Sequence, residues 1–155
     1  MAITKIWSVK SRLDTSLKYI ANPDKTTLQP DIEAVEGVIK YIKNNDKTEQ
    51  CKYVKAYNCT IDKAFSEMME TQEFFGKVGR KNSVLAYHLV QSFKDFETTP
   101  EIAYKCGLEL AERLFADKYE VVVATHLDDK HLHNHIIINA VSYLDGYKYR
   151  NNFKD

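Results

Sequence analysis

Histidines gather in one short stretch of this chain. Of the five in the sequence, four lie within ten consecutive residues, 126–135, and end in the run HLHNH. A strand points every second side chain to the same face, so His133 and His135 share a face. If a turn of about six residues brings His126 of the preceding strand back beside this one, three imidazoles converge. Because neutral imidazoles bind divalent metal ions, the spacing predicts a metal site with three protein ligands.

Three ligands leave coordination positions for water or a substrate, as in catalytic rather than structural sites. Neutral ligands also leave the ion its full charge, which suits an anionic substrate such as a phosphate. Asp128 could hold a ligand imidazole in place, or simply shape the turn. We expect His131 to be a turn residue. His88, in AYHLVQS, is expected to support the ligands or to lie in the core.

A metal site alone fits hydration, hydrolysis, oxygen chemistry and phosphoryl transfer, so a nucleophile is needed to choose among them. If residues 13–21 form a helix, Tyr19 lies about 125° around from its apolar stripe, which is not a core position. Lys18 precedes it, and a polar turn containing Lys25 follows. A tyrosine on such a basic rim can attack a phosphate if the metal neutralises charge and a base takes the phenolic proton.

The elements that position these residues follow from periodicity and turn signals. Alternating or apolar runs predict strands. The clearest helix is predicted by Thr98 or Thr99 as cap, Pro100 at the start and an apolar stripe of Ile102, Cys106, Leu110 and Leu114. The expected strands are 3–10, 53–58, 83–93, 118–127 and 133–143, and the expected helices are 13–21, 61–79 and 98–117. The pattern predicts an α+β fold in which helices pack on one face of an antiparallel sheet, with the metal site on its central hairpin.

Composition narrows the class of protein. The net charge is zero, with 22 basic and 22 acidic residues, so a nucleic-acid site would have to be local. One basic stretch precedes residue 26, and another contains Arg80 and Lys81. Three cysteines without metal-type spacing favour a reducing cytoplasm. The absence of a long apolar run and of a secretory signal predicts no membrane insertion.

Three segments together resemble the nuclease domain of conjugative relaxases, which belong to the HUH endonucleases. SLKYIANPDKT (16–26) resembles the motif that holds the catalytic tyrosine, and AYHLVQSF (86–93) resembles a central strand. HLDDKHLHNHIIIN (126–139) resembles the metal-binding motif, although Asn134 stands where the family usually has an apolar residue. The resemblance covers about Ile3 to Tyr149. It implies one relaxase domain over 1–155, truncated at its C-terminal end.

The resemblance implies that Tyr19 is the nucleophile, that His126, His133 and His135 bind a divalent metal, and that Asp128 supports the histidines. The reaction would be a reversible transesterification on single-stranded DNA at a transfer origin, giving a 5′-phosphotyrosine. We expect Mg²⁺ or Mn²⁺ in the cell, with Zn²⁺, Ni²⁺ or Co²⁺ binding in vitro. Lys18, Lys25, Arg80 and Lys81 are the expected DNA contacts. A monomer working with relaxosome accessory proteins and a coupling protein is expected.

Three other functions remain open. A rolling-circle replication initiator would use a tyrosine downstream of the histidines, and the chain offers Tyr143, Tyr147 and Tyr149. A three-histidine hydrolase or oxygenase would act on a small molecule and have no affinity for DNA. A non-catalytic remnant would bind DNA without cutting it. His131, a metal-bound hydroxide and Asp128 are all candidates for the base that activates Tyr19.

Overall fold

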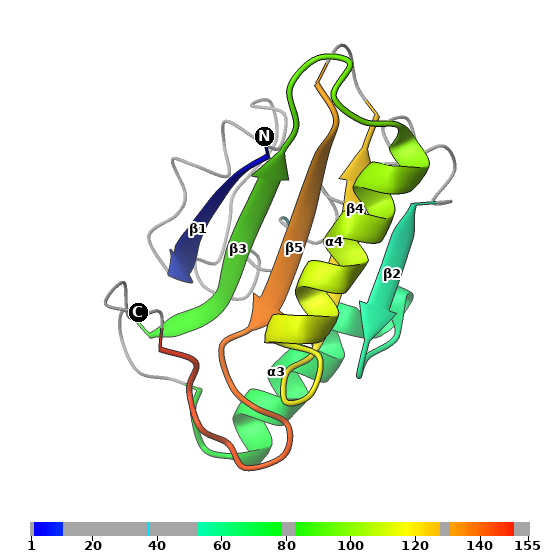
Figure 1. Ribbon diagram of the computed structural model, residues 1–155. Helices are drawn as coiled ribbons and strands as arrows, with labels where there is room; N and C mark the ends of the chain where they lie inside the picture. Colours follow the sequence, from blue (N-terminus) through cyan, green and yellow to red (C-terminus); the bar gives the residue numbers. More distant parts are fainter. Residues whose placement is uncertain (1, 11–36, 38–52, 79–82, 128–130, 151–155) are drawn as a thin grey trace, which may run out of the picture.

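The computed structural model describes residues 2–10, 37, 53–78, 83–127 and 131–150. Its strands form one antiparallel sheet in the order β1-β3-β5-β4-β2 (Figure 1). The strands are β1 (Ile3–Lys10), β2 (Val54–Tyr57), β3 (Val84–Ser92), β4 (Val121–His126) and β5 (His133–Asn139). The helices are η1 (Ile61–Lys63), a short 3-10 helix, α3 (Ala64–Phe74) and α4 (Pro100–Leu114). The predicted α+β class and antiparallel sheet are confirmed.

The predicted strands agree closely with the structure except β5, which was expected to continue to residue 143 and ends at Asn139. β1 has the expected bounds, while β4 begins three residues later than predicted, at Val121. β4 and β5 form the expected antiparallel hairpin, in which His126 pairs with His133. β5 is the middle strand of the sheet. The expected helix at 13–21 lies outside the described residues.

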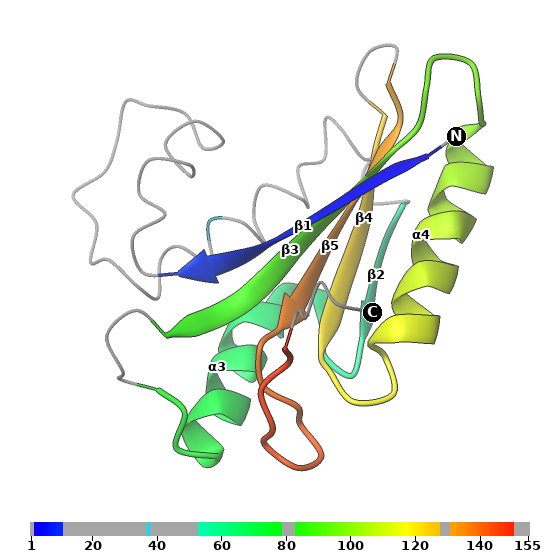
Figure 2. The same ribbon diagram turned by 60° about the vertical axis from the view of Figure 1, so that its left-hand side comes forward.

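The α-helices α3 and α4 do not share a face of the sheet, contrary to the expectation (Figure 2). Met68 of α3 packs in one core cluster with Ile137, whereas Ala111 of α4 packs in another with Ile136. Neighbouring residues of a strand point to opposite faces, so the helices lie on opposite sides of β5. The continuous apolar run Ile136–Ile138 is typical of a strand that is covered on both faces.

Helix α4 lies against the sheet through small side chains. The stripe expected from apolar spacing was Ile102, Cys106, Leu110 and Leu114. The residues that α4 buries are Ala103, Gly107 and Ala111, and Ile102 and Leu114 are both more than half exposed. A Cβ on Gly107 would lie 2.6 Å from the side-chain nitrogen of Asn134, so glycine is what permits this close approach. The predicted start of the helix is confirmed, with Thr99 as cap and Pro100 next.

A buried polar cluster joins α3 to the end of the sheet where β4 begins and β5 ends. Glu120 is 3% exposed and accepts a hydrogen bond from Asn139 Nδ2 at 2.6 Å. Its other oxygen lies 3.0 Å from the Thr71 hydroxyl, and Gln72 donates to Asn139 Oδ1 at 2.9 Å. Burial raises the pKa of the Glu120 carboxyl, and its hydrogen bonds only partly oppose that shift.

Candidate metal centre

Three histidine side chains meet on one face of the β4–β5 hairpin. His126 pairs with His133 across the hairpin, and His135 follows two residues later on the same face. One ring nitrogen from each lies within 4.8 Å of the other two. His126 and His135 are buried and His133 is half-buried. The structure thus brings the three predicted ligands together, and we call this side of the sheet the histidine face.

Hydrogen bonds determine which nitrogen two of the rings can offer to a metal. His133 Nδ1 lies 3.0 Å from the backbone oxygen of His131, which can only accept, so this nitrogen carries the proton. The lone pair of His133 is therefore on Nε2. His135 Nδ1 lies 2.8 Å from His88 Nε2, which leaves His135 Nε2 for a ligand. In metal sites, a hydrogen bond to the ring nitrogen that does not bind the metal orients the imidazole. The donor set therefore fits a divalent cation.

His88 comes from β3 and contacts the ring of His135 through its Nε2. Support of a ligand was one of the two roles predicted for it. Its side chain is 1% exposed. Burial, and secondarily the nearby His126, lowers the pKa of His88 to about 4, so the ring is neutral at neutral pH. The neutral ring of His88 can accept a hydrogen bond at Nε2 from the N–H of His135 Nδ1. On its other side, the ring of Trp7 lies with its centroid 4.6 Å away.

His131 occupies the loop before β5, as predicted. Its side chain is exposed and its Nδ1 lies 2.5 Å from a carboxylate oxygen of Asp95, in the loop after β3. Its backbone oxygen, and not its imidazole, contacts one of the predicted ligands, His133. His131 therefore supports the cluster through its main chain and ties the hairpin to the neighbouring loop through its imidazole.

Asn134, between the two histidines, points to the opposite face, as the strand period predicted. It is fully buried. Its amide nitrogen donates to Gln91 Oε1 at 2.8 Å and to the backbone oxygen of Ala103 in α4 at 2.7 Å. Its oxygen accepts from the Thr125 hydroxyl at 2.6 Å. A polar residue is thus tolerated at this position because all of its hydrogen-bonding groups are used.

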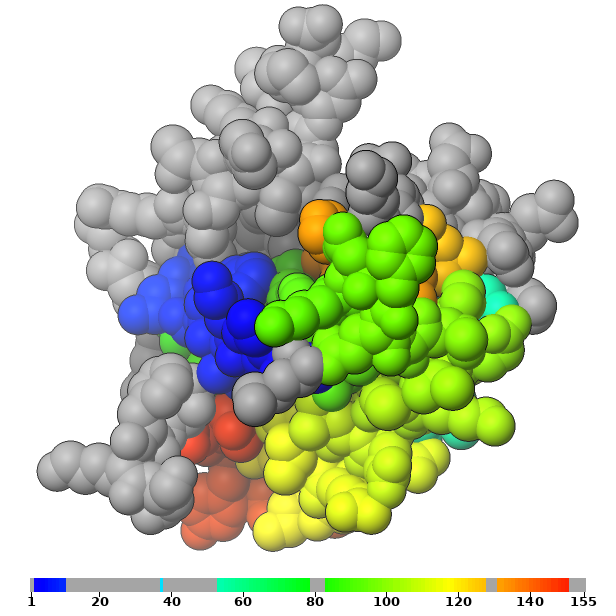
Figure 3. Space-filling model, turned by 45° about the horizontal axis from the view of Figure 1, so that its top comes forward, coloured from blue at the N-terminus to red at the C-terminus, as the bar shows by residue number. Residues whose placement is uncertain are grey.

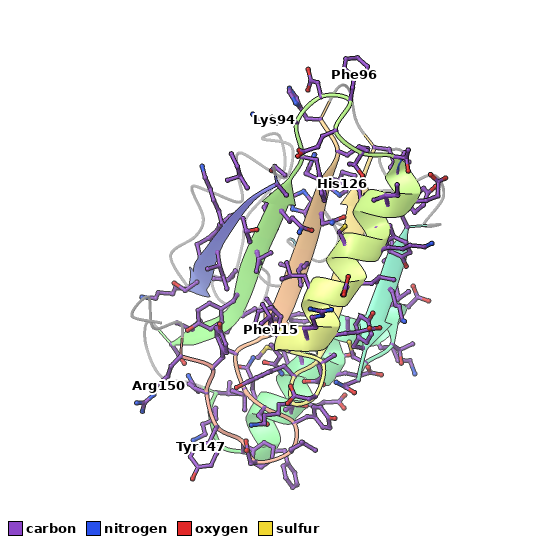
Figure 4. All side chains as sticks on the ribbon, in the orientation of Figure 1. Lys94, Phe96, Phe115, His126, Tyr147 and Arg150 are labelled. Atoms are coloured by element: carbon purple, nitrogen blue, oxygen red, sulfur yellow. The ribbon has the colours of Figure 1, made fainter. Side chains whose placement is uncertain are left out.

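The other predicted site residues lie outside the described residues: Tyr19, Asp128, Lys18, Lys25, Arg80 and Lys81. The three downstream tyrosines are described, and they follow the end of β5 that is away from the histidines. Tyr147 is 74% exposed, and Figure 4 shows it at the opposite end of the molecule from His126. Tyr149 packs its ring 5.5 Å from that of Phe115.

Sequence reasoning missed Trp7, which lies on the histidine face of the edge strand β1. It pairs directly with His88 in the β1–β3 register. The period of two in residues 3–10 would have placed Ile3, Lys5 and Trp7 on one face. Only the register could show that this face is the one carrying the histidines.

Comparison with known proteins places the chain in a family. The family model of the MobA/VirD2-like relaxase nuclease domain matches residues 41–155. The chain therefore belongs to the MobA/VirD2-like relaxases, through their nuclease domain. No helix in the described part of the chain has the length and apolar character to cross a membrane.

Curated relatives agree with this assignment. A protein named rlx from Staphylococcus aureus is 43% identical over 97 residues, which cover 63% of this chain and 30% of the relative. The group II intron-interrupted relaxase LtrB of Lactococcus lactis subsp. cremoris is 31% identical over 141 residues, covering 90% of this chain and 25% of the relative. The chain thus spans about a quarter to a third of the length of these relatives.

Proposed function

We propose that this chain nicks and rejoins one DNA strand at a transfer origin during mobilisation of a plasmid or transposon. The observation that carries the proposal is the convergence of His126, His133 and His135 in a chain of the relaxase nuclease family. Such a site suits a phosphate substrate, because neutral imidazoles do not cancel the charge of a bound cation. The substrate would be single-stranded DNA, since the strand must be accessible to the nucleophile.

In the proposed reaction, the phenolic oxygen of Tyr19 attacks the scissile phosphorus and the 3′-oxygen of the preceding nucleotide leaves. The phenolic proton passes to a base, for which His131 and Asp128 are candidates, and the leaving oxygen takes up a proton. One phosphodiester replaces another, so the 5′-phosphotyrosine can be resealed by the reverse reaction without ATP. A divalent cation, when bound, supplies positive charge to the non-bridging oxygens.

The described residues of the centre hold its imidazoles in place. His88 and the His131 backbone oxygen fix the rings of His135 and His133, and Asn134 anchors the strand between them to α4.

Mg²⁺ or Mn²⁺ is the proposed working ion, and Zn²⁺, Ni²⁺ and Co²⁺ should also bind. One relaxase domain is proposed over residues 1–155. Lys18, Lys25, Arg80 and Lys81 are proposed DNA contacts.

The position of the downstream tyrosines favours Tyr19 over the rolling-circle alternative. Asn139 follows His135 by four positions along β5, a span of about 13 Å at the rise of an extended strand. Tyr143, Tyr147 and Tyr149 follow beyond that end. Since a nucleophile must reach the phosphate held at the histidines, these tyrosines are poorly placed.

We further propose a cytoplasmic monomer that works with relaxosome accessory proteins and a coupling protein.

The test is covalent attachment to DNA. The chain is incubated with Mn²⁺ or Mg²⁺ and a single-stranded oligonucleotide carrying the transfer origin of the element that encodes it. A denaturing gel should show an adduct for the wild type and for Tyr147→Phe, the matched control, and none for Tyr19→Phe. An adduct with Tyr19→Phe would overturn the nucleophile assignment. Binding without nicking by the wild type would indicate a remnant, and no DNA affinity would favour a small-molecule enzyme.

A further inference from the structure

A groove lies beside the histidine cluster on the same face of the sheet. Its volume is ≈360 Å³, at the small end of ligand-binding pockets. Its lining residues are Ile3, Lys5 and Trp7 from β1 and Val90 and Ser92 from β3. Figure 3 shows side chains of β1 (blue) at the surface, next to those at the end of β3 (green).

The sheet register places this groove in line with the predicted metal ligands. Ile3 pairs with Ser92, which pairs with His133. In the next row on the same face, Lys5 pairs with Val90, which pairs with His135. Strands are about 4.8 Å apart, so β1 runs roughly 10 Å from β5. A nucleotide adjacent to one held at the histidines can therefore reach the groove.

The chemistry of the lining suits one nucleotide of a single strand. Trp7 is 38% exposed and makes contact with His88, so its ring is held in place while part of it is open to solvent. Ile3 is 58% exposed and adds an aliphatic wall. Lys5 is exposed, and no acidic side chain is among the described lining residues. An aromatic face for a base next to a cation for a phosphate is the usual arrangement in proteins that bind single strands.

We propose that this groove is a nucleotide subsite that positions the strand next to the scissile phosphate. Trp7 stacks on a base and Lys5 contacts a phosphate. The inference rests on the proposed function and adds to it the residues that hold the substrate. Stacking does not depend on base identity, so this subsite contributes affinity and placement rather than sequence recognition.

The chain contains a single tryptophan, so its fluorescence reports on this groove alone. Adding single-stranded DNA carrying the transfer origin should quench or shift the emission, while the same sequence as a duplex should do so much less. Binding is measured in parallel by anisotropy of a labelled oligonucleotide. Both measurements are made in the presence of a metal chelator. A change in DNA binding then cannot arise from altered metal binding caused by a shift of His88, which contacts Trp7.

Substitutions test the two roles separately. Trp7→Ala should weaken binding by roughly 5- to 150-fold, and Trp7→Phe by less, because a ring remains. Lys5→Gln should reduce the slope of log affinity against log salt by about 0.7, the value for one phosphate contact on a single strand. The controls remove an exposed ring, in Phe74→Ala, and an exposed charge on the far helix, in Lys105→Gln. Neither control should change affinity.

Two outcomes separate this inference from the function on which it rests. If the wild type binds and nicks DNA, but the tryptophan emission stays constant and Trp7→Ala binds normally, the subsite is wrong and the proposed function stands. If the wild type binds no single-stranded DNA, the proposed function fails and the subsite with it.

Discussion

Replacing Gly107 with alanine tests the packing of α4 behind the metal centre. Helix propensity alone predicts that the change stabilises the protein by about 1 kcal/mol. The structure predicts the opposite, because the new Cβ would lie 2.6 Å from Asn134 Nδ2 and 2.7 Å from Cγ. Carbon contacts are optimal at about 3.5–4.0 Å, so the Asn134 side chain must move by about 1 Å.

A shift of that size disrupts the three hydrogen bonds of Asn134, at 2.6, 2.7 and 2.8 Å. Each contributes about 1 kcal/mol net, and overpacking adds about 1–3 kcal/mol. After the gain in propensity is subtracted, Gly107→Ala should lose about 3–5 kcal/mol of unfolding free energy. The double variant with Asn134→Ala should lose less than the sum of the two single changes, since the clash is gone.

Urea denaturation followed by circular dichroism measures these free energies. Lys105→Ala compared with Lys105→Gly, at an exposed position of the same helix, calibrates the propensity term. That pair should differ by about 1 kcal/mol in favour of alanine. A Gly107→Ala protein as stable as the wild type, or more so, would refute the close-packing argument.

Two further predictions concern the histidines and the buried carboxyl. His88→Phe should weaken Co²⁺ binding by roughly 10- to 100-fold in an absorbance titration, because His135 loses the partner of its Nδ1. His131→Ala should leave Co²⁺ affinity nearly unchanged, because His131 contacts His133 only through its backbone oxygen. Equal losses of Co²⁺ affinity in His88→Phe and His131→Ala would contradict these separate roles. The raised pKa of Glu120 means that the folded state holds its proton to higher pH than the unfolded state, so wild-type stability should fall as pH rises above about 4.5. Glu120→Gln should remove that part of the pH dependence in urea titrations, and parallel curves for both proteins would show that the carboxyl is not perturbed.

The histidine cluster could be predicted from sequence because its three members lie on one hairpin. Local spacing and the strand period suffice to place His126, His133 and His135 together. Trp7 and His88 come from separate strands, and their position beside the cluster depends on a register that no local pattern specifies.

The packing of the helices was harder to predict for a different reason. Apolar spacing favoured the larger side chains of α4, yet the residues that contact the sheet are small, since close approach to Asn134 matters more there than hydrophobic area. The side of the sheet on which each helix lies was also mispredicted. The apolar run Ile136–Ile138 carried that information, because it leaves no face of β5 for solvent.

The hairpin origin of the histidine cluster has a consequence for folding. His126 and His133 are separated by only six residues of chain, so closing the loop between them has a small entropic cost. A cation bound there would cross-link β4 to β5 in the folded state and favour that state by mass action. Since β5 is the middle strand of the sheet, this stabilisation would reach the strands on both sides of it. Metal binding at this site would then stabilise the folded sheet in addition to serving the proposed reaction.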